Sequence, residues 1–309
     1  MKVFLTGATG AFGSAAVRSL LERQHDVRAV ARTDDKAASL RALGAEPLRV
    51  DLFDADAVRR AVGGSQVVMH LATNVPPLRR MSTPRAWHTH NRLRAEATRI
   101  LVDAARTNGV SRFVKESVSF VYPDGGDRWI GEETPPAGDV TLLEPTLEGE
   151  RTALGFADGS RAAVVLRFAS FYGPTARYVD EALRMARWRM GMAAGSPAGY
   201  LSAIHTDDVA SAVVAAIDAP TGIYNVGDDE PLTKRDYMDA FASAFGLPRL
   251  HMVPTWAARL ASGPSSVVVT RSWRIINRKL RDATGWTPRY RNAREGWAAV
   301  AASRKASQR

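Results

Sequence analysis

The chain has 309 residues, of which 45% are hydrophobic and 24% are charged, and its formal net charge is +10. This composition is ordinary for a globular protein and excludes disordered, collagen-like and coiled-coil chains. The complete lack of cysteine excludes disulfides, thiolate metal sites and thiol nucleophiles, and we expect no metal site. The first apolar run is too short for a signal peptide or a membrane span, so we expect a cytoplasmic protein without a membrane partner.

The positive charge is concentrated toward the C-terminal end. Residues 271–309 hold eleven basic and two acidic residues, a net charge of +9, whereas residues 1–270 carry only +1. A basic segment of this kind can bind nucleic acid, but no nucleic-acid-binding motif accompanies it. We therefore expect a solvated, arginine-rich surface and no specific nucleic-acid partner.

Apolar runs alternate with helical patterns over the N-terminal half. The predicted strands are Lys2–Thr6, Val27–Ala31, Pro47–Val50, Gln66–Leu71, Arg112–Ser117 and Ala162–Phe168. The predicted helices lie near residues 11–23, 35–43, 54–62, 86–108 and 147–157. Strand–helix–strand units at this spacing form right-handed crossovers and a parallel sheet, whose strands are apolar on both faces when helices cover both sides. The pattern predicts a Rossmann-type, doubly wound α/β fold.

After residue 172 the pattern becomes mostly helical. Helices are predicted near residues 178–190, 206–218, 234–245, 254–262 and 270–282, and short strands at 201–205 and 222–226. We predict a Rossmann domain over residues 1–172, to which some later segments return. Residues 173–309 are predicted to form mainly a smaller, mostly helical substrate lobe with the C-terminal helices.

A glycine-rich turn follows the first predicted strand directly, and residues 6–13 read Thr-Gly-Ala-Thr-Gly-Ala-Phe-Gly. Gly7 permits the tight turn, Gly10 lets the backbone approach a pyrophosphate, and Gly13 lets the next helix pack against the strand. The N-terminus of that helix offers N–H groups and a partial positive charge to the phosphates. An ordinary glycine-rich turn is the alternative, but the strand–turn–helix context favours dinucleotide binding.

The end of the second predicted strand indicates which dinucleotide binds. An acidic residue there would bind a free ribose 2′-hydroxyl, whereas Arg32 can bind a 2′-phosphate. This residue predicts NADP in preference to NAD. Asp34 and Asp35 follow closely and weaken the prediction, and the alternative role for Arg32 is a plain position on the strand surface.

Further stretches match a known pattern: Asp51-Leu52, His70–Thr73, Asn91, Arg167–Pro174 and Ala203–Ala210. With the glycine-rich turn, they make the sequence similar to the extended short-chain dehydrogenase/reductases, also called the NAD-dependent epimerase/dehydratase family. The resemblance implies a nicotinamide dinucleotide in the cleft. The turn, the second strand and the resemblance together nominate these cofactor-binding residues: Gly7, Thr9, Gly10, Ala11, Phe12, Gly13, Arg32, Asp51, Leu52, Leu71, Ala72, Thr73, Asn91 and Phe168.

The sequence departs from this family at the positions that carry its chemistry. In the family a tyrosine exchanges a proton with a substrate oxygen, a lysine four residues later lowers the pKa of that tyrosine, and a serine or threonine hydrogen-bonds the oxygen. Counting back from Leu147–Arg151 places Leu142 at the tyrosine position and Thr146 at the lysine position. Val118 stands at the usual hydroxyl position. Neither Leu142 nor Thr146 can take over the missing chemistry.

Nearby groups are candidates for a replacement acid or base. Ser117 and Ser119 flank Val118, and Tyr122 has suitable chemistry, with burial beneath the site as its alternative role. Lys115 is unusual because a charged side chain in a central strand must be paired or functional, unless the strand ends by residue 114 and leaves it solvated. We nominate Ser117, Lys115, Tyr122 and Ser119 as candidate catalytic residues.

We expect an NAD(P)-dependent oxidoreductase with a non-standard active site that acts on a small or medium apolar carbonyl or hydroxy compound. The alternatives are a non-catalytic NADP-binding sensor or scaffold, and an isomerase, lyase or cyclase without net redox chemistry. Nucleotide-sugar members of the family carry an arginine just before the stretch matched by Ala203–Ala210, and residues 199–203 contain none, so we expect a substrate other than a nucleotide-sugar. The sequence does not fix the oligomeric state, and a homodimer is compatible with it.

Overall fold

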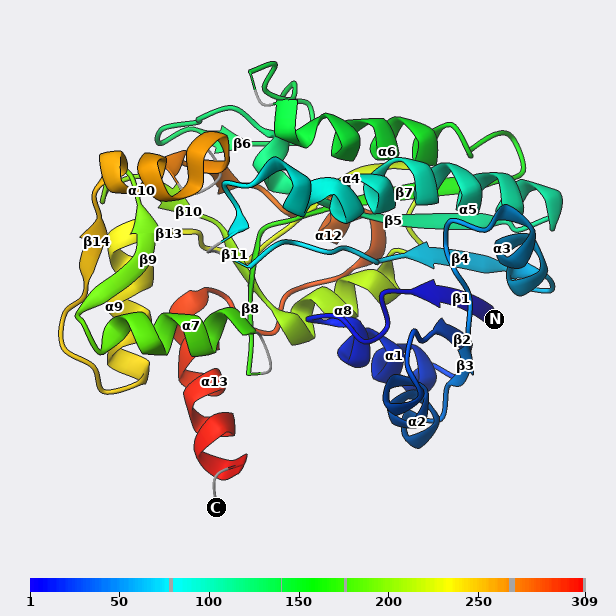
Figure 1. Cartoon of the computed structure of the whole chain (residues 1–309), viewed down its shortest axis with the longest axis horizontal. Helices are drawn as coiled ribbons and strands as arrows, with labels where there is room; N and C mark the ends of the chain where they lie inside the picture. The colour runs from blue at the N-terminus through cyan, green and yellow to red at the C-terminus, as the bar shows by residue number, and fades with distance from the viewer. Residues whose placement is uncertain (78–79, 140, 175–176, 267–269, 308–309) are drawn as a thin grey trace.

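The fold is built around a seven-stranded sheet in which all neighbouring strands are parallel (Figure 1). The computed structural model describes residues 1–77, 80–139, 141–174, 177–266 and 270–307. In spatial order the strands are β12 (Gly222–Val226), β7 (Ala162–Phe168), β5 (Arg112–Val118), β4 (Val67–His70), β1 (Lys2–Thr6), β2 (Asp26–Val30) and β3 (Glu46–Leu48). The winding direction reverses between β1 and β4, and in sheets of this kind ligands bind beyond the carboxyl ends of the strands at such a reversal.

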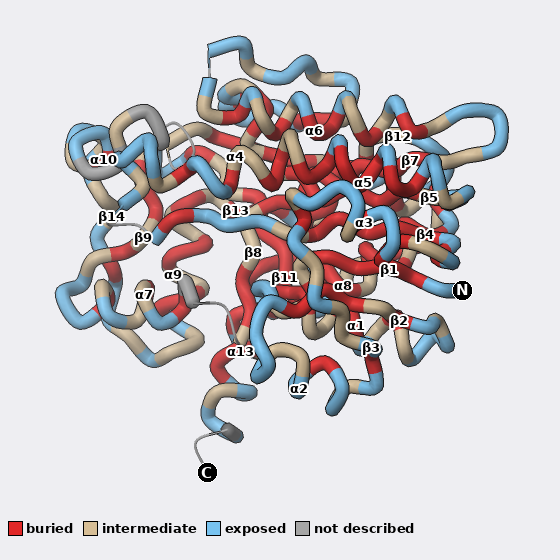
Figure 2. The backbone as a smooth tube through the Cα atoms, turned by 45° about the vertical axis from the view of Figure 1, so that its right-hand side comes forward, coloured by how far each residue is buried: buried red, intermediate tan, exposed pale blue. Residues whose placement is uncertain are grey.

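Helices cover both faces of the sheet, and each face has its own hydrophobic core. Val3 and Leu5 of β1 belong to one core and the intervening Phe4 to the other, because successive side chains of a strand point to opposite faces. The first core includes α1 (Gly13–Glu22), α2 (Asp34–Leu43), α8 (Thr206–Ala215) and α12 (Arg278–Thr284). The second includes α3 (Ala55–Val62), α4 (His88–Arg94), α5 (Glu96–Thr107) and α6 (Glu144–Leu154). Figure 2 shows the buried residues following the strands between these layers.

A smaller body lies beside the carboxyl ends of the strands, at the left of Figure 1. A third core of aromatic and apolar side chains holds it together around Trp297 and Phe241, whose rings are 4.9 Å apart. Its helices are α7 (Arg177–Ala186), α9 (Lys234–Ala244), α10 (Thr255–Ser262) and α13 (Ala293–Ser307). Its short strands are β9 (Met190–Ala194), β10 (Tyr200–Leu201), β13 (Leu232–Thr233) and β14 (His251–Val253).

Short elements connect the two bodies. The strand β8 (Ser170–Tyr172) pairs with β11 (Ala203–His205), and β6 (Trp129–Ile130) pairs with β15 (Arg274–Ile275). The 3-10 helices are η2 (Pro84–Trp87), η3 (Ser119–Val121), η4 (Thr141–Leu143) and η5 (Gly263–Ser266). These connections place residues from both bodies along one edge of the sheet.

The predicted Rossmann-type α/β fold is confirmed, and the six predicted strands of the N-terminal half lie within two residues of the observed ones. The helix predicted near 86–108 is divided into η2, α4 and α5, and α4 and α5 are separated by Ala95, with φ −100° and ψ −66°. The helix predicted near 270–282 is wrong over its first half: Ile275 is buried and pairs with Ile130 in an extended segment, and α12 begins only at Arg278. The strand predicted at 222–226 is β12 of the main sheet.

Candidate functional site

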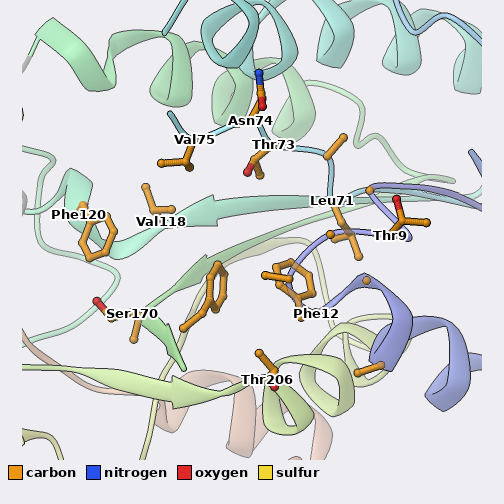
Figure 3. A pocket seen from close by; sticks show the side chains of 18 of the residues that line it. Thr9, Phe12, Leu71, Thr73, Asn74, Val75, Val118, Phe120, Ser170 and Thr206 are labelled. Atoms are coloured by element: carbon orange, nitrogen blue, oxygen red, sulfur yellow. The ribbon is translucent and has the colours of Figure 1, made fainter. Parts of the chain in front are cut away.

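A cavity of about 1410 Å³ runs from the carboxyl ends of β1, β2 and β4 into the smaller body. Figure 3 shows Thr9, Phe12 and Leu71 on one side of this space and Val118, Phe120 and Ser170 on the other. Twelve of the fourteen nominated cofactor-binding residues line it. They are Gly7, Thr9, Gly10, Ala11, Phe12, Gly13, Arg32, Asp51, Leu52, Leu71, Ala72 and Thr73.

Asn91 and Phe168 lie outside the lining of this cavity. Phe168 is fully buried in β7, and its ring packs 5.6 Å from that of Phe12, so it supports the glycine-rich turn from below. Asn91 lies on α4 beside a smaller hollow that Glu148 of α6 also lines. The structure therefore does not bring these two side chains to the cavity.

The backbone of the glycine-rich turn packs closely against the residues that follow β4. Gly7 has φ +80°, and a Cβ atom there would lie 2.5 Å from the carbonyl oxygen of Leu71. A Cβ atom on Gly13 would collide with the backbone of Gly7 and Ala8. The helix α1 that follows has no side-chain cap, so its first N–H groups are left for a ligand. This geometry fits the pyrophosphate of a dinucleotide.

Four cationic side chains line the end of the cavity near β2 and β3: Arg18, Arg32, Lys36 and Arg49. Sequence reasoning found only Arg32, because the other three come from α1, α2 and the segment after β3, which only folding brings together. Arg49 also forms an ion pair with Asp34, 2.9 Å between Nη1 and Oδ1. Asp34 and Asp35 lie in the first turn of α2 and do not line the cavity.

None of the four nominated catalytic residues lines the cavity, and all four are buried. Ser117 belongs to a buried polar layer that Glu150 of α6 and Arg167 of β7 complete. Ser117 donates a hydrogen bond to Glu150, which also accepts two from the Arg167 guanidinium at 2.9 and 2.6 Å. The Tyr122 hydroxyl donates to the side-chain oxygen of Asn225 at 2.8 Å. Each of these side chains is buried and has a partner within the protein.

Lys115 and Ser119 are also buried. The Lys115 ammonium donates to the backbone oxygen of Glu116 at 2.7 Å, and the Glu116 carboxylate is paired with Arg94. Burial lowers the pKa of Lys115 to about 7, and burial raises the pKa of Tyr122 to about 12. Lys115 is therefore a buried strand residue, and the strand continues to Val118 rather than ending by residue 114.

Val118, Leu142 and Thr146 are the residues that the resemblance assigns to the family's catalytic positions. Val118 lines the cavity with an apolar side chain. Leu142 packs into a small apolar cluster beneath the site, which includes Trp273, and Thr146 is buried on α6. None of these three residues offers a proton to the cavity.

The part of the cavity inside the smaller body is largely apolar and aromatic. Its lining includes Phe120, Met192, Tyr200, Leu201, Tyr237, Met238, Phe241, Leu250 and Trp273. Val75 also lines the cavity, whereas Trp188 is 82% exposed. Two cations, Lys234 and Arg271, lie among these apolar residues.

Among the described residues, no three or more histidine, aspartate or glutamate side chains are arranged to hold a metal ion. In the same part of the chain, no helix has the length and apolar character needed to cross a membrane.

Comparisons with known proteins agree with this geometry. A 3-diazoavenalumate denitrifying reductase of a Streptomyces species is 31% identical over 96% of this chain and 99% of its own length. A 2-alkyl-3-oxoalkanoate reductase of Stenotrophomonas maltophilia is 26% identical over 89% of this chain and 84% of its own.

Two solved structures are similar to this chain over nearly its whole length. MoeE5 in complex with UDP-glucose and NAD has a TM-score of 0.80 at 25% identity, covering 100% of both chains. The human epimerase family protein SDR39U1 with NADPH has a TM-score of 0.84 at 19% identity, covering 98% of this chain and 99% of its own, a likeness of fold. The model of the NAD dependent epimerase/dehydratase family matches residues 3–227. The chain therefore belongs to the NAD dependent epimerase/dehydratase family.

Proposed function

We propose that this protein is an NADPH-dependent reductase that acts on a small aromatic substrate by chemistry that needs no tyrosine acid. Two features support the proposal: the glycine-rich turn that fits a dinucleotide, and the residues at the three positions that the resemblance assigns to catalysis. Val118 lines the cavity there with an apolar side chain, and Leu142 and Thr146 replace the tyrosine and lysine expected from the resemblance.

The preference for NADPH rests on the cations near β2 and β3. Arg32, Lys36 and Arg49 line the same end of the cavity as Arg18, so a 2′-phosphate there would have several cationic partners. The neighbouring Asp34 pairs with Arg49 and does not line the cavity, and the four cations outnumber Asp51, the carboxylate after β3 that does line it.

When bound, the reduced nicotinamide supplies a hydride to the substrate. The turn at Gly7–Gly13 and the N-terminus of α1 would hold the pyrophosphate. The ring of Phe12 packs against the rings of Phe168 and Phe171, and this packing supports the turn. Val118 and Phe120 make the opposite wall of the cavity apolar.

The reaction type follows from the lack of a proton donor at positions 118, 142 and 146. Reduction of a carbonyl needs a proton for the oxygen, and that is the task of the family's missing tyrosine. Replacing an aryl diazonium group by hydrogen makes a different demand: the hydride forms the new C–H bond, the C–N bond breaks, and its electron pair leaves with dinitrogen. No proton is transferred, so the residues at positions 118, 142 and 146 suffice. The 31% identical relative named as a denitrifying reductase supports this reaction.

The test compares two substrates of equal size, an aryl diazo compound and an aryl methyl ketone, each with NADPH and with NADH. We expect protein-dependent oxidation of NADPH with release of dinitrogen from the diazo compound, slower reaction with NADH, and no reduction of the ketone. A reaction without protein measures the chemical background. Reduction of the ketone at a comparable rate would contradict the proposed reaction. Tight NADPH binding with turnover of neither substrate would instead indicate the non-catalytic sensor.

A further inference from the structure

The smaller body carries three strongly exposed apolar side chains on its surface. Trp188 is 82% exposed, Trp256 69% and Leu260 83%, and no other large hydrophobic side chain among the described residues exceeds 55%. Trp256 and Leu260 are four positions apart on α10, so they lie on one face of that helix. Exposed apolar side chains that are grouped in this way mark interaction sites, whereas singly scattered ones do not.

Strand pairing brings Trp188 to the same edge of the smaller body, at the left of Figure 1. Trp188 and Arg189 come just before β9, which pairs with β14, and the backbone N–H of His251 donates to the backbone oxygen of Arg189 at 2.7 Å. After β14 the chain passes through Pro254 into α10. Segments that are distant in sequence therefore form one edge, which we call the arginine–tryptophan edge and define by Arg187–Arg189, Arg249, Trp256, Arg259 and Leu260.

The four arginines of this edge have no carboxylate partner among the described residues. All four are exposed, and the two segments that supply the edge, residues 182–206 and 240–281, contain no aspartate or glutamate. The basic C-terminal segment is different, because five of its arginines lie within 3.7 Å of an acidic side chain from elsewhere in the chain. The positive charge of the edge is thus left without an internal counter-charge.

We propose that the arginine–tryptophan edge binds the surface of a lipid bilayer that carries anionic headgroups. Arginines near such a surface are attracted to it, and tryptophan favours the headgroup level of a membrane. The apolar face of α10 with Trp256 and Leu260 would enter the boundary between headgroups and acyl chains. A nucleic acid would also pair with the arginines and could stack bases on the tryptophans, but it offers nothing to the exposed aliphatic side chain of Leu260.

This binding would be peripheral. The expectation of no membrane partner considered only spanning segments, and binding in the plane of the interface needs none. The proposal is also independent of the reductase reaction, because the edge lies on the outer surface and its three apolar residues do not line the cavity.

Vesicle flotation tests the proposal with the wild-type protein. The probes are vesicles of phosphatidylcholine alone and of phosphatidylcholine mixed with phosphatidylglycerol. We expect binding to the mixed vesicles to be at least about tenfold tighter, and to weaken as salt is added, because the attraction between exposed charges is screened. No binding to the mixed vesicles, or equal binding to both kinds, would overturn the proposal.

Three double variants assign the binding to the edge. Trp256→Ser with Leu260→Ser keeps the net charge and should weaken binding to the mixed vesicles at least about tenfold, as should Arg249→Gln with Arg259→Gln. The matched control is Arg23→Gln with Arg41→Gln, which removes two exposed arginines at the ends of α1 and α2 and should change binding less than about twofold.

Thermal unfolding and NADPH affinity check that each variant is folded. Wild-type binding by either folded edge variant would contradict the assignment, as would an equal loss in the control. A DNA oligonucleotide serves as the competing anion: tighter binding of DNA than of the mixed vesicles, lost in the arginine variant and retained in the Trp256/Leu260 variant, would contradict the proposal and indicate a nucleic-acid surface.

Discussion

Replacement of Glu150 by alanine tests whether the layer beneath the cavity is structural. In the native protein the Glu150 carboxylate accepts two hydrogen bonds from Arg167 and one from Ser117. The side chains of Glu150 and Arg167 are 4% and 3% exposed, so water does not replace the lost partner. Removing one member of a buried ion pair leaves the other charge uncompensated, which costs about 3–5 kcal/mol.

This cost is large compared with a typical unfolding free energy of about 5–15 kcal/mol, so Glu150→Ala should be folded but much less stable. Urea unfolding followed by circular dichroism measures it as a lower midpoint at unchanged slope. The matched control is Glu148→Ala on the same helix, where the side chain is exposed and the change should stay within about 0.5 kcal/mol. The double replacement of Glu150 and Arg167 by methionine should recover part of the loss, because no lone charge remains.

A loss below about 1 kcal/mol in Glu150→Ala would refute this reasoning, since it would mean that the pair adds little to stability. Full stability combined with lost turnover would be equally damaging. It would show that the layer containing Ser117 acts in catalysis, as the sequence suggested, although it lies outside the cavity lining.

Four further predictions follow from the same geometry. Arg32→Gln should weaken NADPH binding by about tenfold or more and leave NADH binding nearly unchanged, as fluorescence titration would show. Gly13→Ala should abolish binding of both cofactors, because its Cβ would collide with the backbone of the turn; normal affinity would contradict the assigned cradle. Burial lowers the pKa of Lys115 from 10.5 to about 7, so between these pH values the unfolded chain binds more protons than the folded protein. The free energy of unfolding should therefore rise with pH over this range, by at most about 1.4 kcal/mol per pH unit. Urea unfolding at several pH values measures this rise, and Lys115→Met should remove it. Thr146→Ala should leave turnover nearly unchanged, because Thr146 is buried and does not line the cavity, and a collapse of turnover with intact cofactor affinity would show that Thr146 is catalytic.

The parts of the fold that depend on local sequence were predictable. The apolar run of β1, the glycines after it and the start of α1 are adjacent in the chain, so their pattern alone indicates a strand, a tight turn and a helix. The extended segment at Arg274–Ile275 was missed, because its conformation depends on pairing with β6, which is distant in sequence.

The candidate site was predictable on its cofactor side and much less so elsewhere. Lys115 was interpreted as a catalytic candidate because a charge in a central strand is unexpected, and the sequence does not show that the buried layer around it supplies partners. Arg94 reaches Glu116 across 22 positions, and Arg167 reaches Glu150 across 17. Lys234 gave no signal in the sequence, because its burial depends on the packing of α9 against Ala194 and Thr270, which are distant in sequence.

Isotope transfer tests the central claim most directly. NADPH that carries deuterium at the transferable position of the nicotinamide is incubated with the protein and an aryl diazo compound in ordinary water, and the product is examined by mass spectrometry and NMR. We predict one deuterium on the ring carbon that lost nitrogen, because the hydride forms the new C–H bond and no side chain supplies a proton there. A product whose new hydrogen comes from water would contradict the account.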